Sequence, residues 1–594
     1  MKKEMKTKSK TIVHVVRSIT AAVLLLTAQI SLASSATWLL SPQDSAWENA
    51  NNWTPGGPPN GSSDVATFAQ SSQTNVGIST SVEVNSIVFT SDSSPFSLSV
   101  LGCDTFPCTS QLIISGTGVF NNTNVWQNFI VVNDGQLIFD NASTAASAHM
   151  SIRNGGSLLM NPPEYPGYTI FNDTSSAAGA SITNAAAELA DGPGGKTIFN
   201  GASTADRASI SNEGPPDAHA GGGQTIFNQA STAANASIEN GGSGGASTAV
   251  NAITVFNDTS TAGHAIITNQ GGDFGGLTIF NDSSSAESAI LSAYGAMYGS
   301  GAILFRGAST GGTAQVKVFD NGYLDIRNHQ SGVIIGSVEG SGHVSLGVNN
   351  LTVGTNNIDT SFSGVISGSG SLAKVGRGML TLQSNDCIVD TVGLILVTGS
   401  LIKLDFTGSP DVIASLKVNG VSQPPGIYGG PLSGAPNILP EFDGVGTVRV
   451  GPIATLGNIS SRALVQTGDD VMIGGFIVQG TESKRVIIRA IGPELTQYGV
   501  PNILANPTLE LHDGTGALIA SNDNWQHTIV GGIITENQVR DIMATRLAPR
   551  DPRESAIIAE LPAGSYTAIV RGVNNTTGLL WWKRMILAAG LTQF

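Results

Sequence analysis

Acidic side chains recur at one position of a repeated phrase, and they are the first residues of this 594-residue chain that could do chemistry. Asp173, Asp258 and Asp282 each follow a Phe-Asn pair. Carboxylates stacked on one face of a repetitive fold could act as the acid and base of a glycoside hydrolase, which need a separation of ~5–10 Å. Other copies of the phrase have glycine or glutamine at this position, at Gly201, Gln229 and Gly307. The series therefore implies no fixed catalytic pair, and solvated turn residues are the favoured interpretation.

Histidines and serines give no catalytic pattern either. His149, His264 and His329 are scattered without the spacing of metal ligands, so we assign no metal to them. Serine is abundant, but no Gly-x-Ser-x-Gly elbow stands between a strand and a helix. We therefore predict no catalytic residue and no organic cofactor.

Oxygen-rich turns near the C-terminal end could bind calcium. Asp513 lies in one predicted turn, and Asn522, Asp523 and Asn524 lie in an adjacent one. Carboxylate and amide oxygens are the ligands that Ca²⁺ prefers. Such turns also form without a metal, and this is the favoured interpretation. Asp513 and Asp523 remain the candidates for a calcium site.

Two tryptophans beside asparagines, Trp47 and Trp53, could form a platform on which sugar rings stack. The alternative is that they cap the open end of a repetitive fold, because terminal repeats need an atypical layer that covers the core. We favour the cap. Residues 37–115 are then an N-terminal β region, with strands predicted at 82–89 and 96–100.

The chain has three cysteines. Cys103 and Cys108 flank a short Asp-Thr-Phe-Pro segment, and in an oxidising compartment we expect them to form a small disulfide loop. A zinc site would need further Cys or His partners, which are missing nearby. Cys387 is left over, and we expect it to be buried rather than reactive.

One short phrase, Thr-Ile-Phe-Asn followed by a Ser/Thr-rich segment, organises residues 136–318. Its phenylalanines recur every 24 to 32 residues, and a second apolar residue follows the last six of them at a distance of 11 residues. The first series is Phe139, Phe171, Phe199, Phe227, Phe256, Phe280 and Phe305, and the second is Ile182, Ile210, Ile238, Ile267, Leu291 and Val316. Self-similarity at this period is the signature of a solenoid. We predict a β-solenoid of repeats of ~24–32 residues over 116–350.

Each repeat predicts two short strands, at Thr-Ile-Phe-Asn and at Ala-Ser-Ile-x-Asn, with Gly-rich turns. Neither strand can bury an apolar face alone, so successive copies must stack, Phe on Phe and Ile on Ile. Asparagines then form two ladders that seal turns. The ladders are Asn172, Asn200, Asn228, Asn257 and Asn281, and Asn184, Asn212, Asn240 and Asn269. The absence of a 3.6-residue apolar period excludes amphipathic helices, so the expected fold class is all-β, a parallel β-helix with about one repeat per coil.

Composition and the N-terminus place the protein outside the cell. Charged residues make up only 12% and the net charge is −15, so no basic stripe exists to neutralise the phosphates of a nucleic acid. Residues 1–36 combine six basic residues with an apolar stretch at 21–26 and small residues around Ala33 and Ala36, which is the pattern of a signal peptide. The apolar run is too short to span ~30 Å of bilayer. We expect secretion or display on the outer cell surface, and no transmembrane segment after signal cleavage.

Residues 361–382 follow a different pattern, in which glycines and apolar residues alternate. The positions that define it are Gly364, Ile366, Gly368, Gly370, Leu372, Lys374, Gly376, Gly378, Leu380 and Leu382. This segment resembles the autotransporter-associated β-strand repeat, and the resemblance implies a further coil of the solenoid, with closing strands, over 351–450. The family continues into a strand with Thr-Tyr-x-Gly-x-Thr, from which residues 385–391 depart.

Residues 455–594 predict a separate β-sandwich, because six short strands alternate with turns there. The phrases at 509–525 and 561–570 resemble C-terminal sandwich modules of secreted bacterial proteins. The last strand abandons the polar and apolar alternation at Trp581 and Trp582. Translation of the gene from the third base of each codon would give Val-Glu-x-x-Asp at this place. We therefore hypothesise a reading-frame shift from about Leu579, and resequencing of the gene would test it.

Together these patterns predict an exported protein with a structural or adhesive role, and not an enzyme. Stacked faces of Ser, Thr and Asn suit weak, multivalent contacts with glycans or other cell-surface components. One alternative is a carbohydrate-active β-helix enzyme, a lyase or hydrolase, which would need an acid-lined groove. The other is a passenger-type fragment of an autotransporter system, which would need a C-terminal barrel of ~10-residue strands; residues 455–594 are too few for one.

Overall fold

The computed structural model describes residues 35–55, 57–102, 110–145, 149–156, 165–188, 192–216, 220–244, 251–297, 299–451, 459–478, 483–527, 532 and 537–586. The chain divides into two compact units. The first contains Met1–Gln423 and Ile427–Val448, and the second contains Pro424–Gly426 and Arg449–Phe594.

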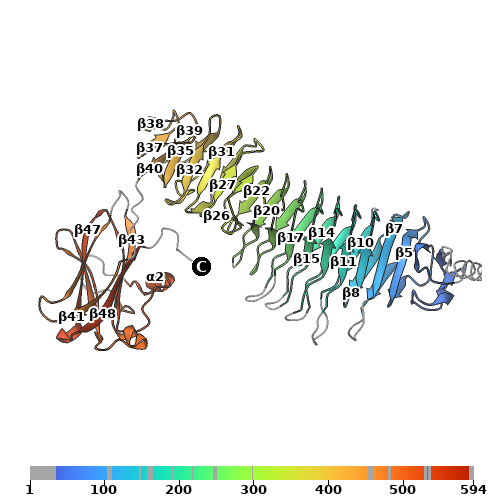
Figure 1. Cartoon of the computed structure of the whole chain (residues 1–594), viewed down its shortest axis with the longest axis horizontal. Helices are drawn as coiled ribbons and strands as arrows, with labels where there is room; N and C mark the ends of the chain where they lie inside the picture. The colour runs from blue at the N-terminus through green and yellow to red at the C-terminus, as the bar shows by residue number, and fades with distance from the viewer. Residues whose placement is uncertain are drawn as a thin grey trace, which may run out of the picture. The chain divides into compact units, whose positions relative to one another are not determined.

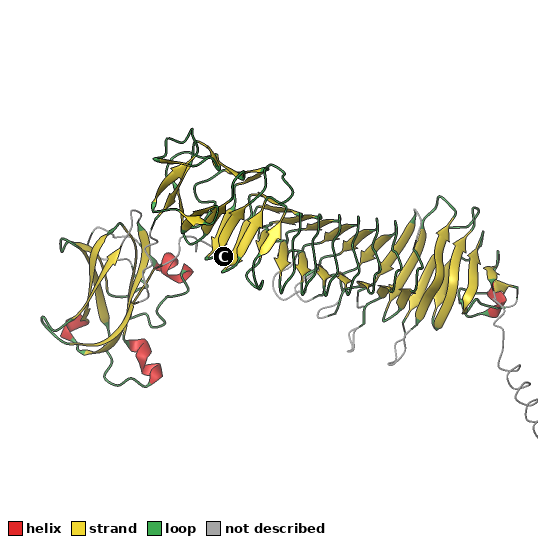
Figure 2. Cartoon of the chain, turned by 45° about the horizontal axis from the view of Figure 1, so that its top comes forward, coloured by secondary structure: helices red, strands yellow, loops and turns green. Residues whose placement is uncertain are grey.

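The first unit is a parallel β-solenoid, so the predicted all-β solenoid fold is confirmed (Figure 1, Figure 2). Two sheets of fifteen strands, sheet A and sheet B, run its length. Sheet A contains β2 (Trp53–Thr54), β1 (Ala36–Trp38), β3 (Gly61–Phe68), β5 (Ser81–Phe89), β7 (Gln111–Asn121), β9 (Gln136–Phe139), β11 (Tyr168–Phe171), β13 (Lys196–Phe199), β15 (Gln224–Phe227), β17 (Ile253–Phe256), β19 (Leu277–Phe280), β21 (Ala302–Phe305), β23 (Tyr323–Asp325), β26 (His343–Gly347) and β29 (Val365–Gly368). Sheet B contains β4 (Asn75–Ile78), β6 (Ser97–Leu101), β8 (Gln127–Val132), β10 (Met150–Asn154), β12 (Ser181–Asn184), β14 (Ser209–Asn212), β16 (Ser237–Asn240), β18 (Ile266–Asn269), β20 (Ile290–Tyr294), β22 (Gln315–Phe319), β25 (Ser337–Gly340), β28 (Thr360–Phe362), β31 (Met379–Leu382), β33 (Leu401–Leu404) and β39 (Phe442–Gly444).

Alternation along each short strand decides what enters the core. In β13, Thr197 and Phe199 are buried while Lys196 and Ile198 face outward. Parallel pairing keeps Phe199 opposite its counterpart in the next coil. From Phe139 to Phe305 the rings stack with centroids 4.7–4.8 Å apart and planes within 9° of parallel. The predicted phenylalanine spine is therefore confirmed.

A third side of the coil separates the two predicted strands, and the sequence reading missed it. Isolated parallel bridges connect one Ser or Thr of each coil to the next, at Thr144, Ser176, Thr204, Thr232, Thr261, Ser285 and Thr310. Toward the C-terminal end this side becomes a six-stranded sheet of β24 (Val333–Ile335), β27 (Asn350–Val353), β30 (Ser371–Lys374), β32 (Gly393–Leu396), β35 (Ser415–Val418) and β36 (Val421–Ser422). A final sheet contains β34 (Asp411–Ile413), β40 (Thr447–Val450), β37 (Gly426–Gly429) and β38 (Asn437–Ile438).

Both predicted asparagine ladders exist, but only one seals turns. In the half-buried turn ladder each amide donates to the preceding coil, as from Asn200 to Asn172 at 3.0 Å and from Asn228 to Asn200 at 2.9 Å. The other ladder lies inside the coil, where Asn184 donates to Asn212 and Asn212 donates to Asn240 at 2.7–2.8 Å. The interior position corrects the prediction.

A threonine of sheet A completes the interior ladder in every coil. Thr197 donates to Asn184 at 2.8 Å and Thr225 donates to Asn212 at 2.9 Å. The amides of Asn184, Asn212 and Asn240 also reach the threonine of the following coil, as from Asn184 to Thr225 at 3.1 Å. Buried polar groups stabilise a fold only when they are hydrogen-bonded, and here the amides and hydroxyls satisfy one another along the stack.

The segment that resembles the autotransporter-associated repeat forms one coil, passing through β28, β29, β30 and β31. Ile366, Leu372 and Leu380 enter the core. Lys374 is buried as well, and its ammonium donates to the carbonyl of Val375 at 2.6 Å. Burial lowers the pKa of Lys374. Gly376 has φ +68°, a conformation that favours glycine.

The second unit is a sandwich of two four-stranded antiparallel sheets, as predicted. One sheet contains β41 (Ile459–Val465), β48 (Gly578–Ile586), β43 (Lys484–Ile491) and β46 (Ser555–Leu561), and the other contains β42 (Met472–Val478), β47 (Gly564–Gly572), β44 (Pro507–Asp513) and β45 (Leu518–Asn522). Within the described part of the chain, the short helices are η1 (Ala50–Asn52) in the first unit and η2 (Pro493–Tyr498), α2 (Val539–Ala544) and η3 (Val573–Asn575) in the second.

The unusual last strand, β48, pairs with both β41 and β43. Trp582 fills the core opposite Gly474, where any Cβ would lie 2.7 Å from the indole ring. The indole N–H of Trp582 is buried without a hydrogen-bond partner. The reading-frame hypothesis stays a prediction.

No helix among the described residues is both long enough and apolar enough to cross a membrane.

Candidate functional site

Sheet B presents one face outward over successive coils, and this face carries the candidate site. Alternate residues of a strand point to opposite sides of a sheet. Lys317 lies opposite Glu339, and Ser361 lies opposite Thr381, which lies opposite Lys403. The pairing of β25 with β28 places Glu339 beside Ser361. These five side chains form one outward column, with a charge or a hydroxyl on every coil.

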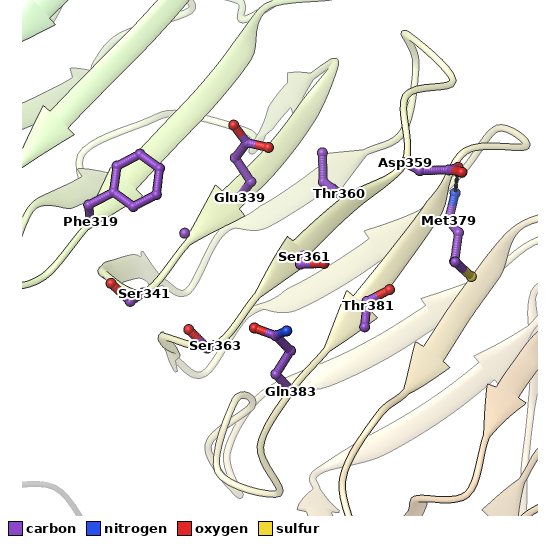
Figure 3. A pocket seen from close by; sticks show the side chains of 11 residues that line it. Phe319, Glu339, Ser341, Asp359, Thr360, Ser361, Ser363, Met379, Thr381 and Gln383 are labelled. Atoms are coloured by element: carbon purple, nitrogen blue, oxygen red, sulfur yellow. Dashed lines mark hydrogen bonds between the residues drawn. The ribbon is translucent and has the colours of Figure 1, made fainter.

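An open groove of about 570 Å³ lies along this column. Figure 3 shows its lining, which comes from β22, β25, β28 and β31 and the turns beside them. The lining residues are Phe319, Glu339, Gly340, Ser341, Asp359, Thr360, Ser361, Ser363, Met379, Thr381 and Gln383. Hydroxyl, amide and carboxylate groups predominate, with an aromatic ring at one end. This mixture suits a ligand with many hydroxyl groups and apolar C–H faces, as a sugar has.

Two carboxylates of the groove lie on successive coils. Glu339 is half-buried, and its carboxylate forms an ion pair with the ammonium of Lys317 at 2.7 Å. Asp359 is exposed and accepts the backbone N–H of Met379 at 2.7 Å. Their positions differ by one coil and two residues along the strand, which places their Cα atoms roughly 8 Å apart at ordinary strand spacing and rise. The two carboxylates point apart, because Glu339 is paired with Lys317 on the preceding coil and Asp359 is bonded to Met379 on the following coil (Figure 3).

An aromatic platform stands at one end of the groove. Tyr294 lies opposite Phe319 in the ladder, and the rings stack with centroids 5.4 Å apart and planes 16° from parallel. Tyr294 is 37% exposed although it is large and partly apolar. An exposed, rigidly stacked ring can cover the C–H face of a sugar at a small entropic cost.

The aspartates of the repeated phrase are turn residues. Asp173, Asp258 and Asp282 have φ of 52–55°, which explains why glycine replaces them in other copies. Their carboxylates accept backbone N–H groups of the preceding coil at 2.8–3.1 Å, as Asp173 does from Asn141. Asp173 also borders a hollow of about 420 Å³ with the turn asparagines. The turn interpretation agrees with these contacts.

The tryptophans of the N-terminal region are buried, so they cannot stack on a sugar. Trp47 is 0% exposed and Trp53 is 4% exposed. With Trp38 they enclose Phe68, at centroid distances of 5.5–6.2 Å from its ring. The rings therefore close the first coil, as the capping interpretation expects.

The three histidines lie apart and have separate surroundings. His149 meets the ring of Trp126 edge to face at 5.5 Å. His264 contacts the hydroxyl of Ser288. His329 is buried between the carbonyl of Ser309, 2.7 Å away, and two backbone N–H groups. Among the described residues, no group of three or more His, Cys, Asp or Glu side chains could hold a metal.

The two calcium candidates do not share a turn. Asp513 ends β44, and its carboxylate accepts the N–H groups of Thr515 and Ala517 at 2.9 Å. These hydrogen bonds and that of the Thr515 hydroxyl lower the pKa of Asp513. Asp523 is exposed and follows the C-terminal end of β45, whereas Asp513 lies beside the N-terminal end of that strand. The preceding residue, Asn522, accepts the N–H of Ala556. A calcium site at either position stays a prediction.

Cys103 and Cys108 lie outside the described residues, and their disulfide stays a prediction. Cys387 is a free, buried cysteine, as expected. Burial raises the pKa of its thiol to about 11. A thiol with so little thiolate at neutral pH is unreactive.

The groove residues were missed by the sequence reading. Phe319 and Glu339 lie within the predicted solenoid of 116–350 and Asp359 lies just beyond it, in a stretch where the Phe-Asn phrase has disappeared. The alternation of residues 315–319 marks a strand in the sequence, but it does not give the pairing of this strand with residues 337–340 or 360–362. The register itself comes only from the turns between strands.

No protein-family model matches the chain. No curated protein matches it either. Among solved structures, the chain is similar to the crystal structure of the enzymatically active domain of tailspike protein 4 of bacteriophage CBA120. The sequences are 12% identical, the TM-score is 0.19, and the match covers 88% of this chain and 64% of that chain.

This comparison corrects one expectation. The domain found is described as enzymatically active, which contradicts the expectation that the chain is not an enzyme. We withdraw that expectation.

Proposed function

We propose that the solenoid is an exported carbohydrate-binding protein, and that the groove on sheet B is its binding site. The observation that carries the proposal is the Tyr294–Phe319 stack, 5.4 Å between centroids, at the end of a groove lined by hydroxyl, amide and carboxylate groups. The open shape of the groove suits an extended chain of sugars rather than a single one. The basic and apolar pattern of residues 1–36 supports export, and attachment to a surface would make the role adhesive.

Affinity electrophoresis tests this proposal, with the full chain run through native gels that contain xylan, galactomannan, polygalacturonate or alginate. We expect at least one polymer to retard the protein. Phe319→Ala and Tyr294→Ala should each abolish most of the retardation, whereas Met297→Ala, which removes an 83% exposed side chain outside the groove lining, should not. Equal retardation of all three variants would refute the groove as the site. Far-UV circular dichroism checks that each variant is folded.

Carbohydrate cleavage is a second candidate function, favoured by the two carboxylates of the groove. In hydrolysis one carboxyl group would protonate the leaving glycosidic oxygen while the other takes a proton from the attacking water. Glu339 and Asp359 have the chemistry for these roles. The test is the release of reducing ends from the retained polymer: wild type should release them, and Glu339→Gln and Asp359→Asn should bind without release. A polymer that wild type binds but leaves intact would refute cleavage and leave binding standing.

A further inference from the structure

Side chains capable of sugar recognition, all exposed except the half-buried His149, also lie in front of the N-terminal ends of successive sheet B strands. In each strand the residue concerned lies two positions before the first side chain that faces outward, for example Arg207 before Ser209. The parallel register of the sheet therefore brings these residues into one row. We call this row the ridge, and it consists of Trp126, His149, Arg207, Asn235 and His264, with Gly179 between His149 and Arg207. Coils stack at about 4.8 Å, so the ridge from Trp126 to His264 is about 24 Å long.

Trp126 is the anchor of the ridge. Its side chain is 50% exposed, although an indole is the largest apolar group that a protein can bury. The ring is nevertheless held in place, because His149 packs edge to face against it at 82° between planes. The preceding turn is tied by Asn121, whose side chain donates to the carbonyls of Val125 at 3.0 Å and His149 at 3.2 Å. A rigid exposed indole is prepared for a ligand with an apolar face.

The rest of the ridge offers hydrogen-bonding groups. Arg207 is 77% exposed at its side chain, and its nearest carboxylate partner, Asp206, is 3.9 Å away. Such a long, solvated contact contributes little, so the guanidinium can bind a ligand. Asn235 and His264 are exposed one and two coils further on. Aromatic, guanidinium and amide groups in one line match the alternating C–H faces and hydroxyl groups of a sugar chain.

The ridge and the groove border the same sheet. Trp126 precedes β8 and Phe319 ends β22, and the seven coil steps between them amount to about 34 Å. The outer face between them carries hydroxyls, including Ser181, Ser209 and Thr183. One long ligand lying on this face could contact both places, and the first contact would raise the effective concentration for the second.

We infer that the ridge is a second contact site for the same polysaccharide that the groove binds, so the ligand is a polymer several tens of ångströms long. This inference rests on the proposed function. The groove then binds short fragments as well as the polymer, whereas the ridge contributes only to binding of the polymer. Linked weak contacts of this kind raise overall affinity by about 10²–10⁴-fold without any new contact type.

The test compares Trp126→Ala, Arg207→Ala, Phe319→Ala and Met297→Ala for binding to the retained polymer and to fragments of it with two to four sugars. We expect Trp126→Ala to weaken polymer binding about 10²-fold, Arg207→Ala to weaken it less, and both to bind the fragments as wild type does. Phe319→Ala should weaken both ligands, and Met297→Ala neither.

The outcomes separate the two claims. Polymer binding by Trp126→Ala equal to that of wild type would overturn the ridge. Loss of polymer binding in Trp126→Ala with none in Phe319→Ala would overturn the groove as the site and leave the ridge as a binding site of its own. Trp126 and Arg207 are exposed, so their loss should not unfold the chain, and the thermal unfolding midpoint of each variant checks this.

Discussion

The interior asparagine ladder should contribute more to stability than the turn ladder, although in both ladders asparagine side chains donate to one another from coil to coil. Replacing Asn212 by Ala removes a fully buried amide, whereas replacing Asn200 by Ala removes a half-buried one. The two variants form a matched pair that differs in the burial of the amide and in the threonine partners of Asn212. We expect Asn212→Ala to destabilise the solenoid by about 2–4 kcal/mol and Asn200→Ala by about 0.5–1 kcal/mol.

These magnitudes follow from the partners left behind. Without Asn212, the hydroxyl of Thr225 loses its acceptor and stays buried, which costs about 1–3 kcal/mol. Asn184 keeps one acceptor in Thr225, and Asn240 keeps one donor in Thr254, so each is weakened rather than orphaned. The small cavity adds about 1 kcal/mol. Without Asn200, water can reach the amide of its neighbour in the turn.

Urea unfolding of the full chain, followed by far-UV circular dichroism, gives the two free-energy changes. Native-state hydrogen exchange of the amides in β14 and β16 locates them in the solenoid. Coils in a repeat structure contact only their neighbours, so the loss of protection should be greatest beside the substituted coil. Equal destabilisation by the two substitutions would refute the assignment of the interior ladder as the buried, fully bonded one.

Three further predictions concern buried titratable groups. Burial raises the pKa of Asp411 to about 9, so the folded solenoid holds one more proton than the unfolded chain between pH ~4 and ~9. The free energy of unfolding should therefore fall as pH rises through that window. Asp411→Asn should flatten the dependence of the unfolding midpoint on pH, and an unchanged slope would contradict the prediction. Burial likewise raises the pKa of Glu554 to about 7; its carboxylate accepts the N–H groups of Gly492 and Glu494. The stability of the sandwich should therefore fall between pH ~4.5 and ~7 and level off above pH 7. Glu554→Gln keeps an acceptor oxygen and should remove this fall in calorimetric scans. Cys387 should react with iodoacetamide at pH 7.5 only after unfolding in urea, as mass spectrometry would show, and rapid labelling of the folded chain would contradict its burial.

The sequence predicts the coil better than it predicts the site, and the reason is periodicity. Phe199 and Ile210 lie 11 residues apart, as their counterparts do in the neighbouring repeats, so their stacking follows from the repeat alone. The third side of the coil escaped because only one residue of each coil, such as Thr204, makes bridges there, and a single residue shows no alternation. The burial of the Asn184 ladder escaped because its asparagines were assigned to the turns, although Asn184 lies two residues after the buried Ile182 and so shares its face of the strand.

The groove could not be read from the sequence, because it depends on residues that do not repeat. Glu339 and Asp359 come from successive coils whose sequences do not repeat each other, and their relative position is set by the register between β25 and β28. The aromatic stack of Tyr294 on Phe319 joins residues 25 positions apart in a region where the phrase has decayed. Trp47 and Trp53 looked equally suited to sugars, and only their burial excludes them.

The central claim is that the groove on sheet B binds a carbohydrate chain through the Tyr294–Phe319 platform. The most direct measurement is isothermal titration calorimetry of the full chain with oligosaccharides of the polymer that retards it, for wild type and for the double variant Tyr294→Ala/Phe319→Ala. Stacking contributes about 1 kcal/mol or more for each aromatic ring beyond its buried area, so the account predicts a loss of at least about tenfold in affinity from the pair. Wild-type affinity in the double variant, with its fold intact, would contradict the account.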